Sequence, residues 1–217
     1  MEDAELVERF PRLFHMAAAG SWPTIRTHGL LSTRWLVDRC DPDPPTRARV
    51  LDRRRDASVV LRDPDGGDVV VRDQSPLREH ILTRVLTDLT VAQWLDVLNN
   101  RVFFWLDPER LAGLLRARRY RRDPHDVLTV DTASLLAAHG DRVRLSALNS
   151  GATLYPNAPP RGSGTFRTVA EHPWPARRPV ELAVIDGVED LVDHLVRVER
   201  RHPDGRVETL WEGCEAP

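Results

Sequence analysis

Hydrophobic and polar positions along the chain follow helical spacing in some segments and strand spacing in others. Apolar residues three or four positions apart predict helices over 3–10, 22–28, 32–40, 76–88, 90–99, 107–119 and 134–140. Thr90 and Asp107 are suitable N-caps, and Pro108 occupies a first helical position. Apolar runs predict strands over 13–16, 101–106 and 126–132, and a hairpin over 58–73. The segment DPDPPT, residues 41–46, predicts a break in regular structure.

Strand patterns dominate the last third of the chain. They cover 141–148, 179–188, 193–201 and 206–213, with a loop rich in Gly, Pro and Asn over 149–165. Helices are therefore expected mostly in the N-terminal two-thirds, and the order lacks the strand-helix alternation of a doubly wound nucleotide fold. We expect a single α+β domain over residues 1–217.

Composition narrows the function classes. The 41% hydrophobic and 29% charged content is typical of a globular domain with its own core. No apolar run approaches the roughly 20 residues that span a bilayer, and the acidic start MEDAELVERF does not resemble a signal peptide. A cytoplasmic protein without a membrane anchor is expected. Cys40 and Cys214 form no zinc or disulfide pattern, and a net charge of -2 argues against a strongly basic nucleic-acid binder.

Common catalytic motifs are missing from the sequence. It contains no GxSxG, GxxxxGK[ST] or HExxH, and no GxGxxG after a strand. The nearest Gly-rich stretch is PPRGSGTF, residues 159–166. Either its glycines and Arg161 approach a phosphate, or it is a flexible connection.

Two polar residues interrupt apolar strand patterns. Glu181, in RPVELAVIDG, shares a strand face with Ala183 and Ile185 by alternation. A carboxylate there is costly unless it is paired or lines a cleft, so Glu181 is either an outward residue of an edge strand or a cleft carboxylate with a shifted pKa. His15, in LFHMAAAG, is either a partly buried histidine bonded to the backbone or a functional residue.

Both segments resemble parts of a known fold. The stretch FHMA...WPTIRTHGLLS is similar to the opening strand and helix of the ADP-ribosyltransferase fold, as found in DarT-type DNA ADP-ribosyltransferases, poly(ADP-ribose) polymerases and RNA 2'-phosphotransferases. VELAVIDGVEDLVDHLVRV, residues 180–198, resembles the closing strands that carry the catalytic glutamate of that fold. The whole chain also resembles a bacterial family of uncharacterised function that contains LN.RVFFW, N.GAT and RG..TF. The resemblance implies split antiparallel sheets.

The same resemblance implies NAD as substrate and no metal. Glu181 would be the catalytic carboxylate that stabilises the oxocarbenium-like transition state, and His15 would hold a ribose hydroxyl. The family's Ser-Thr-Ser element is absent, since FFWLD occupies its place. Four aromatic residues are candidates to stack on nicotinamide: Phe104, Trp105, Tyr155 and Phe166. Arg161 or Arg167 would contact phosphates.

The expected activity is ADP-ribose transfer from NAD to a macromolecule, or NAD hydrolysis. The acceptor would be a nucleic acid or a protein, and an antitoxin-like partner is compatible with a toxin role. Two basic runs, residues 47–55 and 116–122, either contact phosphates or are solvated surface. Two alternatives stay open: a non-catalytic nucleotide-binding module of the same fold, and an RNA 2'-phosphotransferase-like enzyme.

Overall fold

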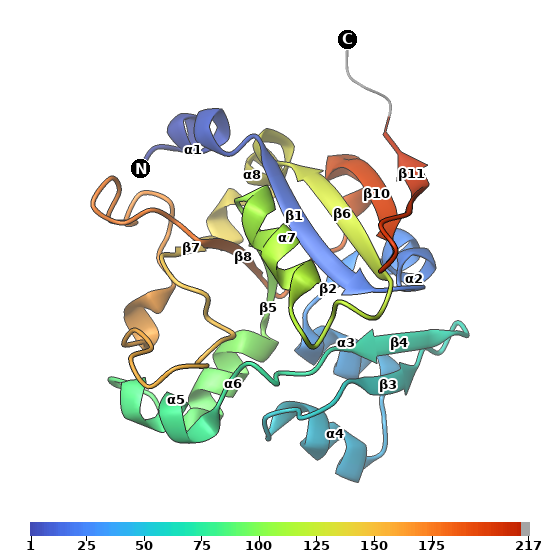
Figure 1. The fold of residues 1–217 in the computed structure, drawn as a ribbon, viewed down its shortest axis with the longest axis horizontal. Coiled ribbons are helices and arrows are strands. Elements are labelled where there is room, and N and C mark those ends of the chain that lie inside the picture. Colours follow the sequence, from blue (N-terminus) through green and yellow to red (C-terminus); the bar gives the residue numbers. More distant parts are fainter. Residues whose placement is uncertain (214–217) are drawn as a thin grey trace.

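The computed structural model describes residues 1–213, and Cys214 lies outside these described residues (Figure 1). Its main element is a seven-stranded sheet in the order β11-β10-β6-β1-β5-β8-β7, in which all neighbours are antiparallel. The strands of this sheet are β1 (Arg12–Ala18), β5 (Arg101–Trp105), β6 (His125–Asp131), β7 (Val143–Ser146), β8 (Glu181–Ile185), β10 (Leu195–Arg201) and β11 (Val207–Glu212). Two small antiparallel sheets pair β2 (Leu30–Leu31) with β9 (Gly187–Val188), and β3 (Val59–Arg62) with β4 (Asp68–Val71).

The large sheet divides between β1 and β5. These strands share a single residue pair, Phe14 with Trp105, whereas β1 pairs with β6 along its whole length. Strands β5 and β8 likewise pair from Arg101 to Trp105. One half of the sheet is therefore β11-β10-β6-β1 and the other is β5-β8-β7, and the two halves part beyond the one shared pair.

All described α-helices precede residue 140, so the expected α+β class and the N-terminal concentration of helices are confirmed. The helices are α1 (Asp3–Arg9), α2 (Trp22–His28), α3 (Thr33–Cys40), α4 (Pro44–Leu51), α5 (Glu79–Val85), α6 (Val91–Asn99), α7 (Pro108–Arg116) and α8 (Thr132–His139). The predicted caps are present, since Thr90 forms a capping box with Gln93 and the Asp107 side chain accepts from Glu109 N.

Helix α4 corrects one prediction, because it begins inside the DPDPPT segment. The Asp43 side chain accepts from Thr46 N, and two prolines fill the first turn. Proline is tolerated there because the first N–H groups of a helix have no partner within the helix. The segment is therefore the start of a helix and not a break in regular structure.

The main core lies on one face of the large sheet. Leu182 and Val184 of β8 pack there with Phe104 and Val102 of β5. A second, smaller core joins α3, α4 and the β3–β4 hairpin around Val37, Val50, Leu61 and Val71. No helix within residues 1–213 is long and apolar enough to cross a bilayer.

Candidate functional site

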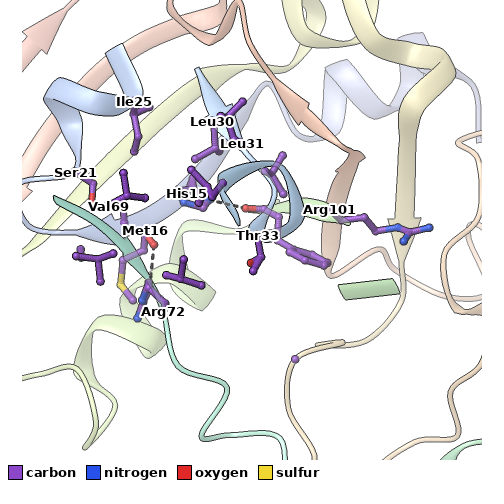
Figure 2. Close-up of a pocket in the computed structure, with 18 of the residues that line it drawn as sticks. His15, Met16, Ser21, Ile25, Leu30, Leu31, Thr33, Val69, Arg72 and Arg101 are labelled. Carbon is purple, nitrogen blue, oxygen red and sulfur yellow. Dashed lines mark hydrogen bonds between the residues drawn. The ribbon is translucent and has the colours of Figure 1, made fainter. Parts of the chain in front are cut away.

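A cavity of about 350 Å³ lies where the two halves of the sheet part. Strands β1, β5 and β8 form one side, and α2, α3 and the β4 strand of the hairpin form the other. His15 reaches this cavity from β1, among side chains of α2, α3 and β4 (Figure 2). Its volume is in the range of small-molecule and cofactor sites.

Glu181 lines the cavity from the start of β8 and is only 4% exposed. Its Oε2 accepts two hydrogen bonds from Ser150, one from the backbone N–H (3.0 Å) and one from the hydroxyl (2.7 Å). Burial raises the pKa of Glu181 to about 7, although both Ser150 bonds and the charge of Arg161 act in the opposite direction. Oε1 accepts no bond from the described residues and is therefore the oxygen available to a ligand.

Arg161 stabilises the loop that holds Glu181. It is 2% exposed, and its NH1 donates to the carbonyls of Ser150 and Ala152, each at 3.0 Å. Its backbone N–H donates to Val85 O at 2.8 Å, which fixes the segment to the end of α5. Arg161 does not line the cavity, so it is not placed for the expected phosphate contact. It acts on Glu181 indirectly, because it holds Ser150.

His15 bridges the gap between β1 and β5. Its Nδ1–H donates to the carbonyl of Phe103 at 2.9 Å, because a carbonyl can only accept. Nε2 then carries a lone pair. Burial lowers the pKa of His15 to about 4, the Phe103 bond partly offsets that shift, and the charge of Arg72 adds to it. The imidazole is therefore neutral near pH 7.

The parting of the sheet lets His15 and Glu181 share one cavity. Phe14 pairs with Trp105, and Trp105 pairs with Glu181, so these three side chains lie on one face. His15 follows Phe14 and points to the opposite face by alternation. In a continuous sheet the two faces would be separated, whereas here both residues reach the same space.

Comparison with known proteins places the chain in a family. A family model described as "Family of unknown function (DUF7002)" matches residues 11–195. The protein belongs to the DUF7002 family. No curated protein and no solved structure matches the chain. The matched range includes every residue that lines the cavity, from His15 to Glu181.

The aromatic candidates lie in different environments in this DUF7002 member. Trp105 lines the cavity directly opposite Glu181 in the strand register. Phe104 also lines the cavity, but it is only 1% exposed, and its ring packs against His15 at an interplanar angle of 63°. Phe166 stacks on Trp94 outside the cavity, and Tyr155 is 69% exposed on the 149–165 loop. Trp105 is thus the aromatic residue placed beside the carboxylate.

The amides of Gly162 and Ser163 in the Gly-Ser-Gly loop donate to side chains of the protein itself. The backbone N–H of Ser163 donates to Asp88 at 2.9 Å, and its hydroxyl donates to the same carboxylate. A side chain at Gly162 would overlap Asp88 and Thr87. The Asp88 carboxylate of the protein itself is therefore the anion that this loop binds. This corrects the interpretation of the loop as a phosphate site. Arg167 is exposed and outside the cavity.

Two clusters within residues 1–213 have ligand atoms suited to a metal, and an arginine interacts with each. In the first, His28, Asp63 and Asp65 surround Arg39, which donates to both carboxylates. In the second cluster, His139, Asp190 and His194, Arg142 donates to His139 Nδ1 at 2.7 Å. His139 therefore carries its proton on Nε2 and directs it at Asp190, 2.7 Å away. Neither arrangement leaves all three ligands free for a cation.

The two basic runs differ in how far their side chains are exposed. Within 47–55, Arg55 is 7% exposed and is bonded inside the protein, while Arg47 pairs with Asp38. Within 116–122, most arginines are exposed, but Tyr120 is buried against the cavity. Each run therefore contributes one residue to the cavity lining, Arg55 or Tyr120, and the arginines of the second run are exposed beside it.

Sequence patterns did not single out Ser150 or Arg72, although both line the cavity. Ser150 lies in an irregular loop without a recognisable motif, and Arg72 follows a strand in an arginine-rich chain. The NSGAT stretch that contains Ser150 contributes to the family resemblance but matches no catalytic motif. The unusual position of Glu181 implies a polar partner, but the sequence does not indicate which residue provides it.

Proposed function

We propose that this DUF7002 protein cleaves the nicotinamide glycosidic bond of NAD and passes ADP-ribose to a macromolecule or to water. The observation that carries the proposal is the convergence of Glu181 and neutral His15 on one cavity at the parting of the sheet. The sequence resemblance to the ADP-ribosyltransferase fold, which rests on the segments that contain the same two residues, also supports it. A nucleic acid or a protein would be the acceptor.

The residues suit each step of this reaction. A ribose hydroxyl would donate to Nε2 of His15, which is fixed by the bond from Nδ1 to Phe103. As the C1'–N bond breaks, nicotinamide leaves with the bonding electrons, and positive charge develops on the ribose. The Glu181 carboxylate stabilises that charge. The nucleophile then forms the new bond at C1', and Glu181 accepts its proton.

The test is release of nicotinamide from labelled NAD by the purified protein. Glu181→Gln keeps the shape of the side chain and removes the charge, so we expect a loss of about a hundredfold or more. Glu199→Gln is the matched control, because Glu199 is also a buried carboxylate on a strand of the large sheet but does not line the cavity. Equal activity of Glu181→Gln and the wild-type protein would contradict the proposed mechanism.

Calorimetry separates the alternatives. Binding of NAD or ADP-ribose without nicotinamide release would support a non-catalytic nucleotide-binding module. Consumption of NAD only with 2'-phosphorylated RNA would support the phosphotransferase alternative. Failure of the protein to bind NAD and ADP-ribose would exclude the proposal and the binding module together.

A further inference from the structure

Two arginines of the cavity wall bond only to neutral acceptors. Arg72, just after β4, donates from NH1 to the carbonyl of Met16 at 2.9 Å, which joins the hairpin to β1 (Figure 2). Its guanidinium lies 4.5 Å from the ring centre of Tyr120. Arg55 donates to the carbonyls of Arg72 and Val50 and to the side-chain oxygen of Asn99. Among the described residues, no carboxylate forms an ion pair with Arg55 or Arg72.

The local charge is therefore unbalanced. Asp73 is the carboxylate whose charge acts on both Arg55 and Arg72. It also lies 3.5 Å from Arg119, so one carboxylate serves three guanidinium groups. Arg119 is exposed and does not line the cavity, so these two guanidinium groups of the cavity wall and this one carboxylate leave an excess of one positive charge beside Arg55 and Arg72.

Burial makes that excess of positive charge unfavourable. Arg55 is 7% exposed, and its burial lowers its pKa to about 10. Burial also lowers the pKa of Arg72. Both groups are still cationic near pH 7, and a buried cation is stabilised by an anion placed next to it. His15 lies on the same wall and is neutral near pH 7, so it does not change this local charge.

We propose that Arg72, supported by Arg55, forms an anion subsite of the cavity that binds a phosphate or diphosphate group of the ligand. A guanidinium has five N–H donors in a planar fork that matches phosphate oxygens, and NH1 of Arg72 uses only one of them on Met16. The identification of this group with the diphosphate of NAD rests on the proposed function. The anion subsite itself does not need turnover.

The experiment compares the binding of ADP and of adenosine by calorimetry. We expect the wild-type protein to bind ADP at least about tenfold more tightly than adenosine, since a charge-assisted bond adds over about 1.4 kcal/mol. Arg72→Gln should bring the two affinities within about twofold of each other, and Arg72→Lys should retain part of the preference. Arg62→Gln is the matched control, because Arg62 lies on the same hairpin, is exposed and pairs with Asp68. It should leave the preference unchanged.

Arg72 also bridges to β1, so thermal unfolding of each variant is measured first. If Arg72→Gln does not fold, Arg72→Lys and the salt dependence of the ADP preference in the wild-type protein decide the question. Equal wild-type affinities for ADP and adenosine, an Arg72→Gln variant that keeps the preference, or a preference indifferent to salt would overturn the subsite. An ADP preference that requires Arg72, without any NAD cleavage, would retain the subsite and remove the proposed function. NAD cleavage without an ADP preference would retain the proposed function and remove the subsite.

Discussion

At the scale of single residues, burial raises the pKa of Glu181 and Ser150 opposes that shift. Its amide and hydroxyl both bond Oε2, and these bonds favour the carboxylate against the effect of burial. Since the pKa of Glu181 is about 7, NAD cleavage that requires the carboxylate should rise with pH and level off above that value.

Ser150→Ala should therefore move the rising limb of the rate profile to higher pH. The substitution removes the hydroxyl bond and keeps the amide bond, so a shift of about one pH unit is expected. The measurement is initial rate against pH from 5 to 9. Ser163→Ala is the control, because its hydroxyl donates to Asp88 outside the cavity. A Ser150→Ala profile that matches the wild-type profile would show that Glu181 is not the titrating group.

The sequence identified the two unusual residues but not their surroundings. His15 and Glu181 stand out because a polar group in an apolar strand needs a partner or a cleft. Ser150, Arg161 and Arg72 act through contacts between segments far apart in the chain, which no local pattern encodes. Arg161 was expected on phosphate, and its interior position follows from carbonyls that only the folded loop brings together.

At the scale of elements, the tight contact between the β2–β9 pair and the end of α2 depends on Gly29. Its φ is +76°, and an added Cβ would overlap the carbonyl of Val188 and the Cα of Glu189. Gly29→Ala should lower the free energy of unfolding by about 3 kcal/mol or more, because the backbone of β9 must move. Urea denaturation measures this loss.

Gly66→Ala provides the comparison within the β3–β4 turn. Gly66 has a similar φ of +94°, but an added Cβ would have no neighbour within 4 Å. Only the cost of the left-handed conformation applies, about 1–2 kcal/mol. Equal losses for the two variants would show that the approach of β9 to Gly29 is not a stabilising contact.

Elements with strong local signals were predicted well. The caps of α6 and α7, the apolar strand β5 and the β3–β4 hairpin all depend on residues close in sequence. Helix α4 differs from the prediction, because the proline-rich segment predicts a break, whereas proline in a first turn is compatible with a helix. The parting of β1 from β5 was implied only by resemblance, since pairing between distant strands leaves no periodicity in either one.

At the scale of the whole molecule, His15 and Glu181 give opposite pH dependences of stability. Between pH 4.5 and about 7 the unfolded chain releases the Glu181 proton while the folded protein retains it, so this residue makes the protein less stable as pH rises. Between about pH 4 and 6.5 the unfolded chain binds a proton on His15 that the folded protein does not, so His15 makes the protein more stable as pH rises. The two slopes nearly cancel in the overlap.

Single substitutions should separate these contributions. Relative to wild type, Glu181→Gln should gain stability as pH rises from 4.5 to 7, by up to about 3 kcal/mol, because a pKa of about 7 replaces the usual 4.5. His15→Gln should show the converse, with a relative gain as pH falls from 6.5 towards 4, of similar size. Urea denaturation at half-unit pH steps gives both curves. A pH-independent difference between Glu181→Gln and wild type would mean that the folded and unfolded states ionise this carboxyl alike, and it would contradict the raised pKa of Glu181.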